Sequence, residues 1–159
     1  MFPTLGMLKQ LPTYSGKAVN FTFTHPLMPV PIVAAGVAAR GVRSYSVRMA
    51  VEHARMEAGI DGAIAPSLIP GEQGEFEITM FQTSTLHRQL LVLYNLIKVA
   101  ADAGDASMWF MGTVVMVVIT DGTTYTGTGV GPAKQPDKSF TEQAQGWTWR
   151  LMACDLQST

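Results

Sequence analysis

Residues 74–104, GEFEITMFQTSTLHRQLLVLYNLIKVAADAG, predict a strand that leads directly into a helix. Within residues 75–81 polar and apolar side chains alternate, which is the period of a strand with one buried face. Residues 83–85 (Thr-Ser-Thr) can accept hydrogen bonds from the free N–H groups that begin a helix. The helix is expected to end at Gly104. Its apolar stripe comprises Leu86, Leu90, Leu93, Tyr94, Ile97 and Ala101.

The composition points to a single domain with a surface that is poor in charge. A chain of 159 residues is long enough for one domain with a substantial core. Its 11 basic and 12 acidic residues give a net charge of −1, which argues against binding phosphate backbones through bulk positive charge. Charged residues are 14% of the chain, against roughly 25% in typical soluble domains. We therefore expect much of the surface to be buried against partners.

Neither membrane insertion nor secretion is expected. The longest apolar run, residues 90–101, contains Asn95 and Lys98 and falls short of the ~20 residues that span a bilayer. The N-terminus lacks the apolar segment of a secretory signal. Cys154 is the only cysteine, so no internal disulfide can form, and a buried, unreactive thiol is expected. These features favour assembly in a cytoplasm.

The remaining segments favour β structure with hairpin connections. Further strands are expected at residues 17–24, 31–35, 44–57, 107–120, 123–130 and 144–156. Asp121 and Gly122 form a typical hairpin turn. An N-terminal arm (residues 1–16) and an extended hairpin arm (residues 57–74) are rich in Gly and Pro, and no regular strand is expected within the second arm. The predicted fold is a single domain over residues 1–159, mainly β with one α-helix, an antiparallel β-sandwich or partly closed barrel.

No group of residues predicts catalysis, a cofactor or a metal. His25, His53 and His87 lack the short spacing of a zinc site. Cys154 with a distant His could form a nucleophile pair, but its strand context favours a packed thiol. The segment GTGVG at residues 127–131 resembles a phosphate loop but lacks the Lys-Ser/Thr that such a loop requires.

Two further pairs have ordinary explanations. Glu75 and Glu77 share a strand face, as the carboxylates of a glycosidase might, yet like charges at this spacing are typical of a solvated face. Trp147 and Trp149 could stack on sugars or bases, but beside Leu151 they are more often core or interface residues. We therefore predict that the protein is not an enzyme.

Several stretches resemble the tail tube proteins of long-tailed bacteriophages, particularly those with contractile tails. They are GEFEITMFQTS (74–84), LHRQLLVLYNLIK (86–98), VITDG (118–122), TTYTGTG (123–129), QPDKSF (135–140) and WTWRLMACDL (147–156), with weaker matches in YSGKAVNFTF (14–23) and SVRMAVEH (46–53). The resemblance implies a tail tube fold and a protomer whose sheets join those of its neighbours in a hexameric ring. Stacked rings would form the hollow core inside a tail sheath.

The resemblance also implies partners and a location. The partners would be further copies of the chain, the sheath, and the baseplate and tail terminator proteins, while DNA would pass without specific binding. The protein would belong to the virion tail and assemble in the host cytoplasm. Two alternatives stay open: a tube subunit of a contractile secretion or bacteriocin-like injection machine, and a small-molecule or carbohydrate-binding β-domain.

Two sets of residues are candidates for these roles. A lumen that passes DNA should not attract phosphates, and an acidic or neutral wall meets this requirement. The candidates for the lumen wall are Glu75, Glu77 and Glu52. Apolar residues without a regular element to shelter them are candidates for contacts between subunits. These are Ile60, Ile64, Leu68 and Ile69 in the hairpin arm and Leu91 on the polar side of the helix.

Overall fold

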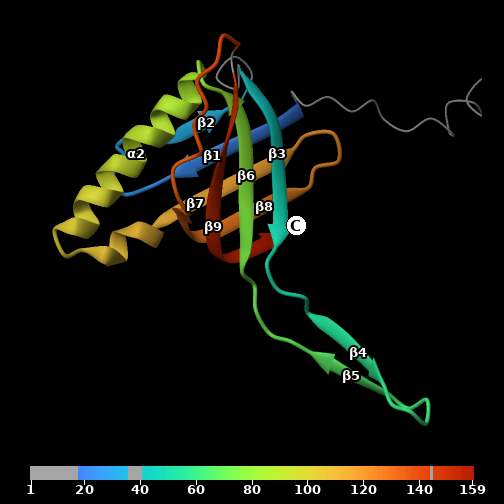
Figure 1. Ribbon diagram of the computed structural model, residues 1–159. Coiled ribbons are helices and arrows are strands. Elements are labelled where there is room, and N and C mark those ends of the chain that lie inside the picture. Colours follow the sequence, from blue (N-terminus) through green and yellow to red (C-terminus); the bar gives the residue numbers. More distant parts are fainter. Residues whose placement is uncertain (1–17, 36–40, 144) are drawn as a thin grey trace, which may run out of the picture.

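A seven-stranded antiparallel sheet, curled into a half-barrel, forms the body of the protein (Figure 1). The computed structural model describes residues 18–35, 41–143 and 145–159, so the predicted N-terminal arm lies outside the described residues. The strands of this sheet are β1 (Val19–Thr24), β2 (Ile32–Ala34), β3 (Val42–Met49), β6 (Gly74–Phe81), β7 (Gly112–Val118), β8 (Thr124–Pro132) and β9 (Gly146–Ser158). Their order is β2-β1-β7-β8-β9-β6-β3. The predicted antiparallel, partly closed β architecture is confirmed, and the described residues contain one α-helix.

Helix α2 (Thr85–Asp102) follows β6 directly, as the sequence predicts. Its N-cap residue is Ser84, and Gly104 stops it with a φ of 98°, a conformation that glycine adopts without steric cost. The predicted apolar stripe faces the sheet, because Leu86, Leu90, Leu93 and Ile97 are all buried in the core. The stripe also includes His87, which the pattern of apolar residues alone did not identify.

The core lies between α2 and the concave sheet and is rich in aromatic residues. Alternation along β6 buries Phe76, Ile78 and Met80, and alternation along β9 buries Trp147, Trp149, Leu151 and Ala153. Phe21 and Phe23 of β1 complete the same cluster. The same alternation exposes Cys154, so the expectation of a buried thiol is wrong. Cys154 lies on the outer side of β9, one position away from the buried Ala153.

The prediction of one long strand over residues 44–57 is wrong, because β3 ends at Met49 and the chain bends there. Met49 lies opposite Gly74, where β6 begins, so the main sheet offers no partner beyond this point. The chain continues as β4 (Ala54–Ala58), which pairs with β5 (Ile64–Leu68) in a separate two-stranded sheet. No regular strand was expected within residues 57–74, so β5 was missed. This strand contains Pro66. An edge strand tolerates proline, since its outer N–H need not join a ladder.

The strand expected at residues 107–120 is also shorter. Its first part is a 3₁₀ helix, η3 (Ala106–Phe110), and β7 starts only at Gly112. Trp109 anchors this turn. Its Nε1–H donates to the Pro132 carbonyl at 2.9 Å, and its ring meets Tyr94 of α2 edge to face at 5.7 Å. These long-range contacts outweigh the β propensity of the sequence.

Two buried histidines are hydrogen-bonded through their ring nitrogens. In His25, Nδ1 accepts the Leu27 N–H at 3.1 Å and Nε2 donates to the Met108 carbonyl at 2.8 Å. In His87, Nδ1 accepts the Nε1–H of Trp149 at 2.9 Å. Burial lowers the pKa of both histidines; the Met108 bond opposes this for His25, and the charge of Lys138 adds to it for His87. Both environments therefore favour the neutral form of the ring.

We expect the free energy of unfolding to fall as the pH drops below about 6.5, the ordinary pKa of histidine. In this range the histidines of the unfolded chain bind protons more readily than those of the folded protein, so acid favours unfolding. Urea titrations between pH 7.5 and pH 5 measure this loss. The double variant His25→Gln/His87→Gln should show a flatter pH profile, and His53→Gln, at an exposed position, is the matched control. An unchanged profile in the double variant would show that other groups cause the acid sensitivity.

Candidate functional site

The outer, polar face of the sheet carries a four-residue ion network. Alternation along β6 directs Glu75, Glu77 and Thr79 away from the core. The strand register then places Arg48 of β3 opposite Glu75, and Arg150 of β9 opposite Glu77. Directly opposed side chains of opposite charge stabilise an antiparallel pair. Three strands thus contribute to one cluster.

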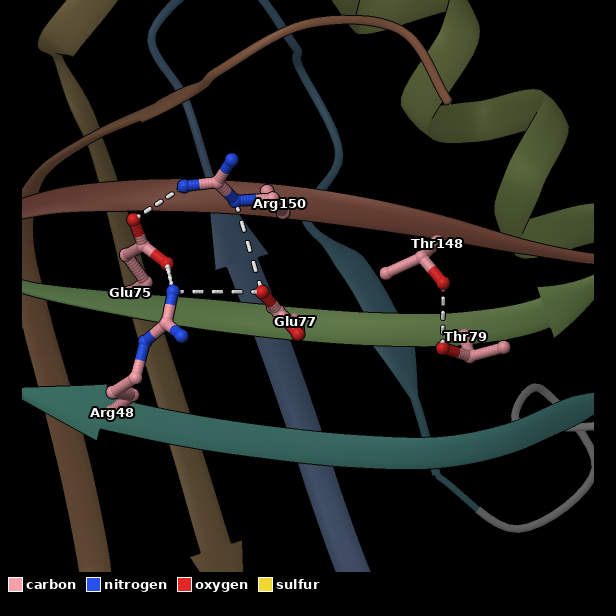
Figure 2. A network of polar contacts seen from close by, with 6 residues as sticks. All are labelled: Arg48, Glu75, Glu77, Thr79, Thr148 and Arg150. Atoms are coloured by element: carbon pink, nitrogen blue, oxygen red, sulfur yellow. Dashed lines mark hydrogen bonds and ion pairs between the residues drawn. The ribbon is translucent and has the colours of Figure 1, made fainter. Parts of the chain in front are cut away.

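Glu75 is the centre of the network (Figure 2). Its Oε2 accepts a hydrogen bond from Nη2 of Arg48, and its Oε1 accepts one from Nη2 of Arg150 at 2.6 Å. Glu77 Oε1 lies farther from the same guanidinium groups, 3.8 Å from Nη2 of Arg48 and 3.7 Å from Nε of Arg150. Beside the network, the hydroxyl groups of Thr79 and Thr148 are hydrogen-bonded at 2.8 Å. The face is therefore polar but close to neutral.

The electrostatic state of Glu75 argues against a role of this carboxylate as a general acid. Glu75 is only 8% exposed, and burial alone would raise its pKa. The hydrogen bonds and charges of Arg150 and Arg48 outweigh burial and hold the pKa below its ordinary value. A general acid needs a pKa near the working pH, so Glu75 is poorly suited to donate a proton. The arrangement serves to bind three strands together and to balance charge.

Glu75→Gln is expected to lower the free energy of unfolding by about 1–3 kcal/mol, because it removes the charge that both guanidinium groups share. Glu77→Gln is the matched control, since it lies on the same strand face with longer contacts, and should cost less than about 0.5 kcal/mol. Urea denaturation at pH 7 measures both values. Equal losses for the two variants would contradict the central position of Glu75.

The other predicted lumen and helix residues lie elsewhere. Glu52 is exposed in the segment between β3 and β4, and the structure does not bring it to the network. Leu91 is half-buried and packs against the core. The apolar residues that α2 does expose are Val92, Leu96 and Val99. Sequence reasoning missed them, although their spacing of three and four residues marks one helix face.

The β4–β5 hairpin extends away from the sheet and has one apolar face (Figure 1). Its register brings together on that face Ala54, Met56, Ala58, Ile64, Pro66 and Leu68. The opposite face carries Arg55, Glu57, Ala65 and Ser67. Every one of these side chains is exposed. We call β4, β5 and the turn between them the hairpin arm.

The four predicted contact residues of this segment fall into three positions. Ile64 and Leu68 lie on the apolar face, and Ile60 is fully exposed in the turn at the tip. Ile69 is half-buried at the base, where its N–H donates to the His53 carbonyl at 2.8 Å. Met56 belongs to the apolar face as well and was missed, although the alternation Ala-Arg-Met-Glu-Ala in residues 54–58 predicts it. An apolar face of this kind, left open to solvent, is typical of a binding surface.

The other sequence patterns that suggested chemistry form neither a metal site nor a phosphate loop in the described residues. Within the described ranges, no group of three or more His, Cys, Asp or Glu side chains is placed to hold a metal ion. Residues 127–131 lie inside β8 rather than in a phosphate loop. Trp147 and Trp149 are buried in the protein. None of the helices in the described part of the chain is long and apolar enough to cross a membrane.

Comparisons with known proteins give one family and a shared fold. Residues 11–159 match the family described as "Bacteriophage PhiTE tail tube protein". No curated protein sequence matches the chain. A chain of the anti-feeding prophage (AFP) baseplate is 16% identical with a TM-score of 0.57, covering 94% of this chain and 97% of that chain.

Two further solved structures have TM-scores of 0.51 and 10% identity. One is a chain of the anti-feeding prophage tube-terminating cap, where the match covers 94% of this chain and 92% of that one. The other is a chain of the sheath/tube terminator of PVC, an extracellular contractile injection system, where it covers 95% of this chain and 99% of that one. At such low identities the likeness concerns the fold.

Proposed function

The chain belongs to the bacteriophage PhiTE tail tube protein family, and on this premise we propose that its protomers form hexameric rings that stack into a hollow tail tube. The tube would conduct DNA and form the core inside a contractile sheath. The protein has a mechanical role in this proposal and catalyses no reaction. The observation that carries it is the hairpin arm, whose apolar face is entirely exposed in the isolated protomer.

The edges of the main sheet support ring formation. Among the described residues, β3 pairs only with β6 and β2 pairs only with β1, so each strand has one unpaired edge. Open edges invite pairing with another chain, and closing a ring of sheets would remove them. The eight-residue β3 is long enough to add a neighbouring strand. In the ring we expect β3 to join the sheet of the next protomer.

The polar face of the sheet fits the lumen wall of such a tube. Arg48 and Arg150 balance Glu75 and Glu77, so this cluster has no net charge to attract phosphates. Strong DNA binding relies on cationic side chains that release counterions from the phosphates, and here both cations are already paired. We propose that Glu75 and Glu77 face the lumen and that DNA passes without being bound. Glu52 would lie near one mouth of the channel.

The sheath, baseplate and tail terminator proteins are the proposed partners. The similar solved structures come from a baseplate, a tube cap and a sheath/tube terminator. In the assembled particle the outside of the tube would face the sheath. Assembly would take place in the host cytoplasm, and the finished tube would belong to the virion tail.

A second candidate is the tube of a contractile injection machine that carries no genome. Two of the similar structures belong to the anti-feeding prophage and one to an extracellular contractile injection system. The protomer fold and stacked rings would be the same in both cases. The two functions differ in the cargo of the tube, so nuclease-protected DNA in ejecting particles would favour the phage tail.

Size-exclusion chromatography combined with negative-stain microscopy tests the proposal against a compact binding module. A tube protein should elute as large species above a threshold concentration and show rings with a central hole or filaments built from them. A carbohydrate-binding or small-molecule-binding β-domain should remain a monomer at every concentration. Monomers alone at high concentration, even with a baseplate complex added to initiate assembly, would overturn the proposal.

A further inference from the structure

A groove beside the start of α2 has largely apolar walls. Its volume is about 760 Å³. Leu91 and Val92 of α2 form one wall, and Phe140, from the loop before β9, forms the other. Phe140 is 78% exposed and meets the Trp147 ring edge to face at 5.8 Å. Such an exposed aromatic side chain at the rim of a groove can pack against an inserted apolar residue.

Two buried polar atoms in the lining of this groove lack hydrogen-bond partners. Trp147 is only 7% exposed, and its Nε1–H has no acceptor among the described residues. Gln82 likewise has a buried Oε1 without a donor. Buried polar atoms are almost always satisfied in native assemblies. An inserted peptide segment would offer both missing groups, a carbonyl for Trp147 and an N–H for Gln82.

The positive charge of the groove favours the binding of an acidic segment. Arg88 and Lys138 are the charged side chains among the described residues that line it, and no carboxylate does so. Lys138 Nζ lies 5.8 Å from the centre of the Trp147 ring. The first turn of α2 contains no acidic residue that would offset the positive end of the helix. A ligand with one apolar side chain next to one carboxylate would complement these features.

The tip of the hairpin arm has this composition. Ile60 is fully exposed, and Asp61 follows it. Asp61 Oδ1 accepts the Ala63 N–H at 3.0 Å, while the Gly59 N–H donates to the Ala63 carbonyl at 2.7 Å, so the turn is closed, and both Ile60 and Asp61 remain exposed. Gly62, with a φ of 83°, permits this tight turn. The tip is therefore organised before it meets a partner.

The start of α2, which lines the groove, and the hairpin arm lie at opposite ends of β6 (Figure 1). The arm leaves beside Gly74, where β6 begins, and α2 starts four residues after Phe81, where β6 ends. Eight strand residues span roughly 25 Å. The arm moreover points away from the groove, so a protomer cannot fill its own groove. A tip that enters the groove of another copy makes a head-to-tail contact, which can repeat without limit along an axis.

We infer that Ile60 and Asp61 at the tip of one protomer's hairpin arm insert into the groove of a protomer in the adjacent ring, with Ile60 between Val92 and Phe140 and Asp61 beside Arg88 and Lys138. This inference rests on the proposed function, and it assigns the contact that stacks the rings. It would also give partners to two of the four buried side-chain atoms that lack a hydrogen bond in the described residues, Trp147 Nε1 and Gln82 Oε1.

Disulfide trapping tests the contact in the full chain. Ile60→Cys combined with Val92→Cys, in a Cys154→Ser background, should give a ladder of covalent oligomers on non-reducing gels after mild oxidation. The matched control replaces Val99 instead of Val92. Val99 is more exposed on α2 than Val92, 68% against 47%, but lies about 10 Å further along the helix, beyond the ~7 Å between Cα atoms that a disulfide can bridge. It should give no ladder.

A charge exchange provides an independent measurement. Asp61→Arg and Arg88→Asp should each raise the protein concentration needed for filament formation at least about tenfold, and the double variant should recover much of the loss. Filaments in the microscope without a Val92-dependent ladder, or without recovery in the double variant, would overturn the contact and leave the tube proposal intact. Absence of rings and filaments in the unmodified protein would overturn both.

Discussion

Ile64→Asp is expected to prevent the rings from stacking while the protomer stays folded. Ile64 lies on the apolar face of the hairpin arm and is exposed in the protomer, so the free energy of unfolding should change by less than about 0.5 kcal/mol. In the tube the same face would be buried, and an unpaired carboxylate there would be strongly unfavourable. The concentration needed for filament formation should rise at least about 100-fold, equivalent to ~2.7 kcal/mol. Sedimentation of filaments over a concentration series measures this shift.

Ser67→Asp provides the matched control. Ser67 belongs to the same strand, β5, but lies on the polar face opposite Arg55. It introduces the same charge without touching the apolar face, so filaments should form at nearly the original concentration. Circular dichroism and urea denaturation test whether both variants are folded. If Ile64→Asp sediments like the unmodified protein, the apolar face of the arm has no role in assembly.

Trp149→Ala should cause the largest loss of stability of any single change considered. Trp149 is fully buried, and its ring meets Tyr94 of α2 at 6.1 Å and His87 at 5.8 Å. Removing a buried aromatic ring leaves a cavity and typically costs about 3–5 kcal/mol. Such a loss is a large part of the stability of a domain of this size. Urea denaturation at pH 7.5 measures it.

Trp149→Phe separates packing from hydrogen bonding. The smaller ring keeps most of the packing but removes the Nε1–H that His87 Nδ1 accepts, so about 1–3 kcal/mol should be lost. Phe140→Ala, at an exposed position, should cost less than about 1 kcal/mol. A Trp149→Ala variant as stable as the Phe140→Ala variant would contradict the placement of Trp149 in the core.

Local patterns in the sequence predicted the elements whose buried side chains recur at a short, regular spacing along the chain. The alternation in residues 75–81 and the stripe from Leu86 to Ile97 each depend on a short-range period, and both are found in the structure. The Asp121–Gly122 turn between β7 and β8 is local as well. The buried and exposed faces of β9 follow from the same alternation, and applying it strictly would have placed Cys154 outside.

Long-range pairing decided the features that the sequence did not predict. The bend after Met49 depends on where β6 begins, 25 positions later, because that sets the end of the available partner. The partners of Glu75 lie 27 and 75 residues away in the chain, so spacing could not reveal that its charge is balanced. The groove beside α2 likewise combines lining residues from 82–95 with Lys138, Phe140 and Trp147.

A cryo-electron microscopy reconstruction of filaments assembled from the purified protein tests the central claim most directly. The proposed function predicts stacked rings of six protomers around an open channel, with Glu75, Glu77, Arg48 and Arg150 on the channel wall. It also predicts the hairpin arm buried between protomers. A reconstruction in which Glu75 and Glu77 lie on the outer surface would contradict the lumen assignment, and a particle without a closed ring would contradict the tube itself.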